Sequence, residues 1–253
     1  MKLLYATLIG LVLIASRQTP AIAENSITIA AQEMPGLLEA GKPLPYNQLL
    51  DLLLENADQS INVEILPGYR GPRRWLRREY DCIFGGVSGP GHSLPPNTRI
   101  TEADWYSLHI SRPFNTLKVH AFGGPRSEPV HKIEDLAGKQ IAVDQVLLFD
   151  LRFHTKALGP INIVKVGSAS EALNLLLRGR VDQIYAYDND MALAAGGEMD
   201  EFAFDPDFVL LELEESVMCW PGEGIENLIG HVNSKLKNLS ESGALRDMLK
   251  PPQ

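Results

Sequence analysis

The sequence predicts an α/β fold in which parallel strands alternate with covering helices. Three observations support this prediction. Residues 27–87 change in turn between strand-like and helix-like hydrophobic spacing, the same change returns over residues 118–212, and neither region contains a short internal repeat or a low-complexity tract. Such an order is typical of βαβ units, in which helices cover a parallel sheet.

The first region supplies a βαβαβ series. Residues 27–31 form a short apolar strand, 46–56 a helix, 61–66 an alternating strand, 70–78 a basic helix, and 81–87 an apolar strand that ends in glycines. Leucines share one face of the helix over 46–56, namely Leu49, Leu50, Leu53 and Leu54. Residues 88–104 are rich in Gly, Pro and Ser and predict a loop.

The second region contains the clearest local pattern. Strands are predicted at 117–122 and 140–143, with a short helix at 132–139 between them. Ser168 and Glu171 form a capping box at a helix start, and Gly179 stands where the helix should end. A strand at 181–186 follows, and then extended segments at 208–213 and 217–220 and helices over 224–248.

The N-terminus predicts a secretory signal peptide. Lys2 precedes an apolar run over residues 3–15, and Ala21 and Ala23 form an A-x-A cleavage site. An uncleaved membrane anchor is the alternative, but the run is shorter than the roughly 20 apolar residues that a spanning helix needs. We therefore expect cleavage after Ala23 and export to the periplasm. We expect no later membrane span, and we expect a monomer because nothing in the sequence indicates an oligomer interface.

The charge balance excludes nucleic acid as a partner. The chain has 23 Lys and Arg against 32 Asp and Glu, a net charge of −9. Removal of residues 1–23 takes away Lys2 and Arg17 and leaves 21 basic against 32 acidic residues, or −11. Binding to phosphate backbones depends on an excess of Lys and Arg. No metal or cofactor motif is present, so we expect neither.

The two cysteines, Cys82 and Cys219, leave two interpretations open. An exported protein permits a disulfide between them. Two separate buried thiols would fit the sequence equally well, because free cysteine is among the most buried residue types.

Four stretches, taken in order, resemble extracellular solute-binding protein family 3. They are Leu66-Pro67 with Arg70, Leu76 and Asp81; Ser111-Arg112-Pro113-Phe114; residues 133–143; and residues 168–182. Val232-Asn233 and residues 242–245 are similar to the last helices of that family. The resemblance covers nearly all of the chain after residue 23.

The resemblance implies a two-lobed periplasmic binding protein type II fold with two crossing hinge strands. Lobe 1 would comprise residues 24–117 and a return segment, 214–253, and lobe 2 residues 118–213. Cys82 and Cys219 would then lie in one lobe, within the roughly 4.4–6.8 Å between Cα atoms that a disulfide usually needs. The implied function is capture of a small molecule for an inner-membrane ABC-type permease.

The family's amino-acid determinants are absent or displaced. Trp105 stands where the resemblance expects the Arg that holds a carboxylate, and Tyr187 stands where it expects an Asp, with Asp188 one residue further. We therefore expect a ligand other than a standard α-amino acid. The candidate ligand-binding residues are Arg70, Ser88, Trp105, Tyr106, Arg112, Tyr187 and Asp188.

Two other functions remain open. An eroded pocket would suit a sensory or partner-binding protein that contacts a membrane sensor. A periplasmic enzyme on the same fold, such as a cyclic-acid dehydratase, would need a clear anion-binding Arg beside an acid or base, and none is evident. We therefore expect no enzymatic activity and no catalytic residues.

Overall fold

The computed structural model describes residues 26–88, 100–145, 147–159 and 161–249. The predicted signal peptide, residues 1–23, lies outside the described residues, as does most of the predicted loop over 88–104. None of the helices in the described part of the chain combines the length and the apolar character needed to cross a bilayer.

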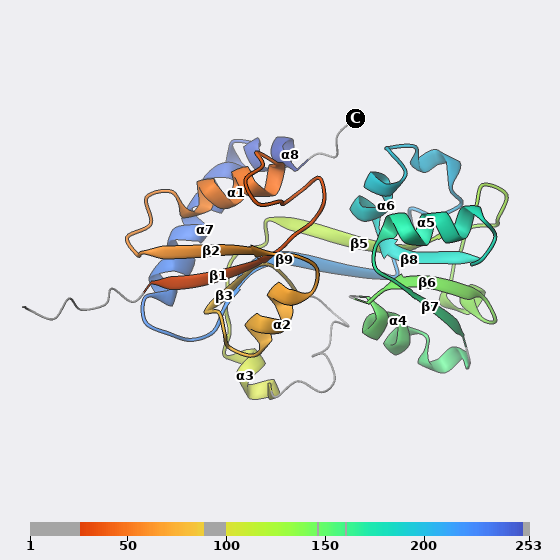
Figure 1. Cartoon of the computed structure of the whole chain (residues 1–253), viewed down its shortest axis with the longest axis horizontal. Coiled ribbons are helices and arrows are strands. Elements are labelled where there is room, and N and C mark those ends of the chain that lie inside the picture. Colours follow the sequence, from red (N-terminus) through yellow and green to blue (C-terminus); the bar gives the residue numbers. More distant parts are fainter. Residues whose placement is uncertain (1–25, 89–99, 146, 160, 250–253) are drawn as a thin grey trace, which may run out of the picture.

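Two lobes lie side by side and are joined by two long strands (Figure 1). The first lobe contains β1 (Ile27–Gln32), α1 (Pro45–Leu54), β2 (Ile61–Leu66), α2 (Arg70–Leu76), β3 (Cys82–Ser88), α3 (Glu102–Tyr106), β4 (His109–Ile110), α7 (Ile225–Glu241) and α8 (Ala244–Met248). The joining strands are β5 (Asn115–Gly123) and β9 (Leu211–Cys219). The second lobe contains 3-10 turns at Ile133–Leu136, Lys156–Leu158 and Met199–Glu201, with β6 (Gln140–Asp144), α4 (Leu148–His154), β7 (Asn162–Val166), α5 (Ala169–Leu177), β8 (Gln183–Tyr187) and α6 (Asp188–Ala194).

One hydrogen-bonded sheet runs through both lobes in the order β2-β1-β3-β9-β5-β8-β6-β7, with β4 paired to β9. The strands β1, β2 and β3 are parallel, and so are β6, β7 and β8. The joining strands are antiparallel to each other and to their neighbours β3 and β8. Residues 115–119 of β5 pair with residues 211–215 of β9, and the rest of each strand pairs within one lobe, so both strands connect the two lobes.

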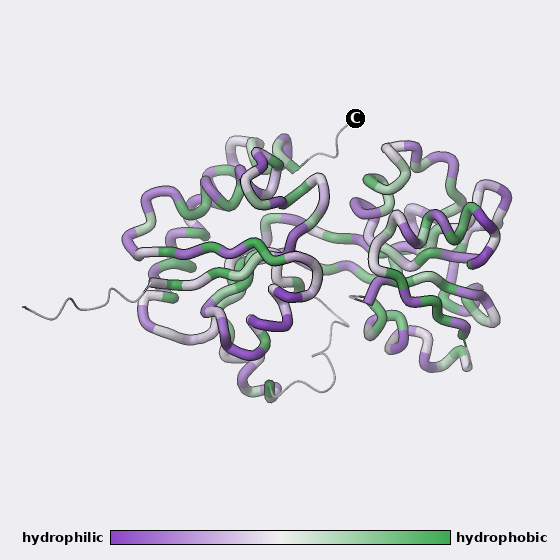
Figure 2. Tube along the Cα trace, viewed as in Figure 1, coloured by the Kyte–Doolittle hydropathy of each residue, from purple (hydrophilic) through white to green (hydrophobic). Residues whose placement is uncertain are grey.

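Helices cover the sheet in each lobe, as the βαβ order predicts, and they do so on both faces. In the first lobe, α1 and α7 pack on one face through Leu49, Leu53 and Leu228, and α2 and α3 cover the other face around Trp75. In the second lobe, α4 lies against one face and α5 with α6 against the other. Figure 2 shows the hydrophobic residues concentrated along the central strands and the hydrophilic ones on the outer turns.

The predicted α5 helix forms for the expected reasons. Its N-cap, Ser168, accepts a hydrogen bond from the backbone N–H of Glu171 at 3.2 Å. The Glu171 carboxylate accepts from the N–H of Gly167, one residue earlier than a capping box requires. Gly179 follows the helix with φ of 62°, the left-handed conformation that glycine adopts without cost.

Several predicted boundaries need correction. The short helix over 132–139 is a 3-10 turn at Ile133–Leu136, and the segments at 208–213 and 217–220 belong to one strand, Leu211–Cys219. The predicted loop at 88–104 gives way to helix α3 at Glu102 because Thr101 and Asp104 form a reciprocal capping box there. The short helices α4 and α6 were not predicted.

Candidate ligand-binding site

The topology brings the carboxyl ends of both sets of parallel strands to the junction between the lobes. In the first lobe β3 is antiparallel to β9 and ends at Ser88, opposite Glu214. In the second lobe β8 is antiparallel to β5 and ends at Tyr187, opposite Val119. Ligands of open α/β sheets bind outside the carboxyl ends of the strands. The junction is therefore where a binding site is expected.

A buried carboxylate lies on a joining strand at this junction. Glu215 is opposite Asn115 in the β5–β9 pair and is only 3% exposed. The Tyr46 hydroxyl donates a hydrogen bond to its Oε2. Asn115 Nδ2 donates to the same Oε2 and to the Tyr46 hydroxyl oxygen, both at 2.8 Å. The pKa of Glu215 is raised to about 7, chiefly by burial, with a smaller increase from Asp190, while the two hydrogen bonds act in the opposite direction.

Three more carboxylates come from the second lobe. Asp144 ends β6, Asp150 lies in the first turn of α4, and Asp190 lies in the first turn of α6. Asp190 is open to solvent, yet enough protein surrounds it to raise the pKa of its carboxyl to about 6, with Asp144 as the second cause.

Two tyrosines connect these carboxylates electrostatically to the first lobe. Tyr69 directly precedes α2, and its pKa is raised first by burial and then by Asp144, Asp150 and Asp190. Tyr187 ends β8 and is 8% exposed. Its pKa is raised by burial, then by Tyr69, Asp150, Asp190 and Glu215. Groups from both lobes and from a joining strand therefore share one electrostatic environment.

We call this set of side chains the junction cluster. Its members are Tyr46, Tyr69, Asn115, Asp144, Asp150, Tyr187, Asp190 and Glu215. Four of them are acids and three are tyrosines. The exposed Arg73 of α2 lowers the pKa of Tyr69, but burial and the acids together raise it by more. The cluster is thus strongly acidic and aromatic.

Four of the residues predicted from the sequence lie at or next to this cluster. Tyr187 belongs to it, and Arg70 follows Tyr69 as the exposed first residue of α2. Ser88 is half-buried at the end of β3. Asp188 begins α6, but its Oδ1 lies 2.5 Å from Nδ1 of the buried His120, which occupies its carboxylate.

The structure does not place Trp105 and Tyr106 with the cluster. Both belong to α3, which Figure 1 shows at the outer edge of the first lobe. Trp105 packs edge-on against Trp75, with ring centroids 6.2 Å apart, and Tyr106 is 83% exposed. The partly buried Trp105 ring packs against the first lobe's core, which explains the position of this side chain.

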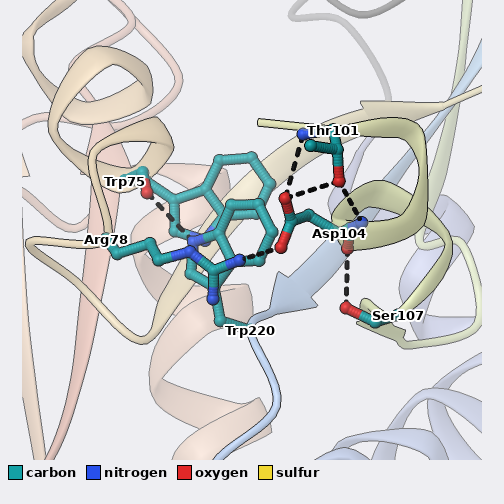
Figure 3. Close-up of polar contacts among 6 residues, drawn as sticks. All are labelled: Trp75, Arg78, Thr101, Asp104, Ser107 and Trp220. Carbon is teal, nitrogen blue, oxygen red and sulfur yellow. Dashed lines mark hydrogen bonds and ion pairs between the residues drawn. The ribbon is translucent and has the colours of Figure 1, made fainter. Parts of the chain in front are cut away.

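A polar network holds α3 against α2 (Figure 3). Arg78 lies over the Trp220 ring at 4.4 Å and binds Asp104 at 2.5 Å. The indole N–H of Trp220 donates to the Trp75 carbonyl at 3.0 Å, and Asp104 accepts from Thr101. These contacts connect elements within one lobe, which indicates a structural role.

Arg112 also lies apart from the cluster. Its side chain is exposed, and its backbone N–H donates to Asn233 Oδ1 of α7 at 2.6 Å. This contact anchors the segment before β5 to the first lobe.

The two cysteines are joined in a disulfide. Cys82 of β3 is directly opposite Cys219 of β9, and the backbone N–H of Trp220 donates to the backbone carbonyl of Asp81 at 2.8 Å. This pattern marks a non-hydrogen-bonded pair, in which facing residues come closest. The Cα atoms are 4.0 Å apart, somewhat less than the expected range. The bond fixes the end of a joining strand in the first lobe.

A shallow depression of about 450 Å³ on α5 is a poorer candidate. It is lined by Glu171, Asn174, Leu175 and Arg178, which all come from α5 or its end, and it includes no member of the junction cluster.

The sequence contained one usable indication of Glu215. Leu211, Leu213 and Glu215 share the buried face of β9, while Glu212 and Glu214 are exposed. Period-two alternation therefore puts Glu215, unlike its two neighbours, on the inner face. The predicted extended segments at 208–213 and 217–220 do not include residues 214–216, so the prediction does not contain this pattern.

Comparison with known proteins supports the fold. The chain matches no protein-family model and no curated protein sequence. It has the two-lobed fold of type II periplasmic binding proteins. The arginine-, lysine- and histidine-binding protein ArtJ from Geobacillus stearothermophilus superposes with a TM-score of 0.63 at 18% identity, covering 90% of this chain and 97% of that one.

Two further solved structures share the fold. The substrate-binding protein of an amino acid ABC transporter gives a TM-score of 0.61 at 17% identity, covering 88% of this chain and 97% of that one. A histidine kinase sensor domain with similarity to periplasmic binding proteins gives 0.66 at 14% identity, covering 89% and 94%. At these identities the likeness concerns the fold, because function depends on the site.

Proposed function

We propose that this chain is a periplasmic solute-binding protein that captures a small molecule between its lobes for an ABC-type transporter. The observation that carries the proposal is the junction cluster, in which side chains from both lobes and a joining strand meet at the carboxyl ends of the strands. A ligand that contacts both halves of such a cluster favours the closed state and shifts the population toward it.

The lobe boundaries belong to the same proposal. We place them at 117/118 and 213/214, where Leu117 and Leu213 face each other in the β5–β9 pair. Rotation about these two paired residues would move residues 118–213 as a body against residues 24–117 and 214–253. Export through a signal peptide cleaved after Ala23 would deliver the protein to the periplasm.

The proposed ligand is not a standard α-amino acid. A bound α-carboxylate is best held by a guanidinium. Trp105, the residue that the family resemblance aligns with that Arg, packs against Trp75 in the first lobe's core. The acids of the junction cluster would repel a carboxylate further.

A thermal-shift screen of residues 24–253 tests the proposal. The panel contains amino acids, amines, organic acids and aromatic metabolites. A ligand at about 100 times its Kd stabilises the folded state by roughly 2.7 kcal/mol, which for a chain of this size raises Tm by roughly 5–10 °C. Failure of every compound class to raise Tm would contradict the solute-binding function.

A sensory role is the second candidate, because a histidine kinase sensor domain shares the fold over 89% of this chain. Both roles require a ligand, so the partner separates them. A permease encoded beside this chain, with ligand uptake that depends on it, supports transport. A membrane kinase in that place, with phosphorylation that depends on the ligand, supports sensing.

We also propose that the chain is not an enzyme. Glu215, with a pKa of about 7, is the group that could act as a general base, so a ligand found in the screen should be incubated with the protein and followed by NMR. We expect the ligand to be recovered unchanged, and any turnover that Glu215→Gln abolishes would overturn this part of the proposal.

A further inference from the structure

We propose that the junction cluster binds an organic cation without a carboxylate group, such as an amine or a guanidinium compound, through Glu215, Asp190 and Tyr69. This inference rests on the proposed solute-binding function and names the chemical class of its ligand.

The first observation is that Glu215 has one oxygen available. Oε2 accepts from Tyr46 and Asn115, whereas within the described residues no hydrogen bond reaches Oε1. Oε1 therefore retains the capacity to accept a hydrogen bond. Gly85, with φ of 76°, faces this oxygen and places no side chain over it. A 3%-exposed carboxylate with one open oxygen is arranged to accept a hydrogen bond from a charged donor.

The second observation concerns two tyrosine hydroxyls. In the described part of the chain, the buried hydroxyls of Tyr69 and Tyr185 have no hydrogen-bond partner. Tyr69 lies beside Asp144, Asp150 and Asp190, and Tyr185, which is 1% exposed, lies beside Asp150. Buried hydroxyls normally have partners, because an unmade hydrogen bond costs roughly 1–3 kcal/mol. A ligand N–H group would supply a donor for these oxygens.

The charge around the cluster favours a cation. Four carboxylates interact with Tyr69 and Tyr187, and Arg73, which opposes them at Tyr69, is exposed to solvent. The helices that begin at this edge also carry acids in their first turns, Asp150 in α4 and both Asp188 and Asp190 in α6. Those acids already occupy the positive ends of the helix dipoles, so an anionic ligand group would gain little there.

The geometry favours an organic cation over a metal ion. Among the described residues, no group of three or more His, Cys, Asp or Glu side chains is placed to hold a metal. The carboxylates are instead interspersed with Tyr69 and Tyr187, and tyrosine rings stabilise organic cations at their faces.

Isothermal titration with matched pairs of compounds tests the inference on residues 24–253. The pairs are agmatine with arginine, putrescine with ornithine, and histamine with histidine, in which each amine lacks only the carboxylate of its partner. We expect at least one amine to bind roughly tenfold or more tightly than its amino acid. Equal or tighter binding of the amino acids, or of an organic acid, would overturn the cation inference and leave the solute-binding function intact. Binding of neither member of any pair also overturns the inference, and the wider thermal-shift panel then decides whether any solute is bound.

Variants connect the affinity to the cluster. For the amine that binds, Glu215→Gln and Asp190→Asn should each weaken binding by roughly tenfold, because each removes an anion that faces the ligand. Glu212→Gln is the matched control, because it removes the same charge from the exposed side of the same strand and should leave the affinity unchanged. If Glu215→Gln does not fold, the solvent-accessible Asp190→Asn still gives the test. Equal affinities for all three variants would overturn the assignment to this cluster.

Discussion

Replacement of Glu215 by Gln is expected to stabilise the empty protein at neutral and alkaline pH. Glu215 is 3% exposed, and burial is the main cause of its raised pKa. A Gln side chain of the same shape can still accept from the Tyr46 hydroxyl and from Asn115 Nδ2 through its carbonyl oxygen. The substitution therefore removes a buried charge and retains the hydrogen bonds that hold α1 against the joining strands.

The size of the effect follows from linkage between protonation and folding. A carboxyl whose pKa rises from 4.5 in the unfolded chain to about 7 in the folded protein keeps its proton longer when folded. The associated stability is present in full below pH 4.5 and is lost as the pH rises to about 7. At about 1.4 kcal/mol for each pH unit, the wild type loses on the order of 3 kcal/mol over that interval. The Glu215→Gln variant has no carboxyl at this position and does not lose this stability.

Urea unfolding at pH 5 and pH 8 measures this difference. The free energy of unfolding of Glu215→Gln relative to wild type should increase by roughly 2–3 kcal/mol between the two pH values. The exposed Glu212→Gln control should show little change, since its carboxylate is solvated in both states. If the free energy of unfolding of Glu215→Gln relative to wild type is the same at both pH values, the Glu215 carboxyl is not desolvated. The expectation that burial raises its pKa would then be wrong.

Three other predictions concern the scaffold. The Cys82–Cys219 disulfide joins residues 137 positions apart in the chain. Its reduction and alkylation should lower the free energy of unfolding, measured by chemical denaturation, by roughly 2–5 kcal/mol. Ser168→Ala should cost about 1 kcal/mol by removing the α5 N-cap, whereas Ser170→Ala on the exposed face of the same helix should be nearly neutral. Leu228→Ala should cost about 2–5 kcal/mol in urea, because the fully buried side chain of α7 would leave a cavity against α1.

The order of strands and helices could be predicted because it depends on local periodicity. The alternation over 61–66 and the apolar face of α1 survive in the structure as β2 and as a buried helix face. The helices α4 and α6 were not predicted because each has only seven residues. A helix of two turns has too few positions for its hydrophobic spacing to be distinguished from a loop.

The site was harder to predict because its members are adjacent only in space. Tyr69 follows β2, Asp144 ends β6 and Asp190 follows β8. Their proximity depends on the parallel order of β6 and β8 and on the joining strands. Trp105 shows a second limit of the sequence. The family resemblance aligns it with an Arg, but alignment along the chain does not give the direction of its side chain, which packs against Trp75.

Glu215 is expected to lower the stability of the empty protein and to strengthen the binding of a cation. These two opposite effects distinguish a binding carboxylate from a residue with a purely structural role. In the empty protein the buried carboxylate lowers stability above neutral pH, so Glu215→Gln should raise the Tm of the empty protein. A bound cation is stabilised by the negative charge of Glu215 and less so by a neutral Gln side chain. The amine should therefore raise the Tm of the Glu215→Gln variant by less than it raises the Tm of the wild type. A residue that only supports the fold would change the first quantity and leave the second unaffected. A higher Tm without ligand together with a smaller ligand-induced increase is therefore the combination that a binding carboxylate at the hinge produces.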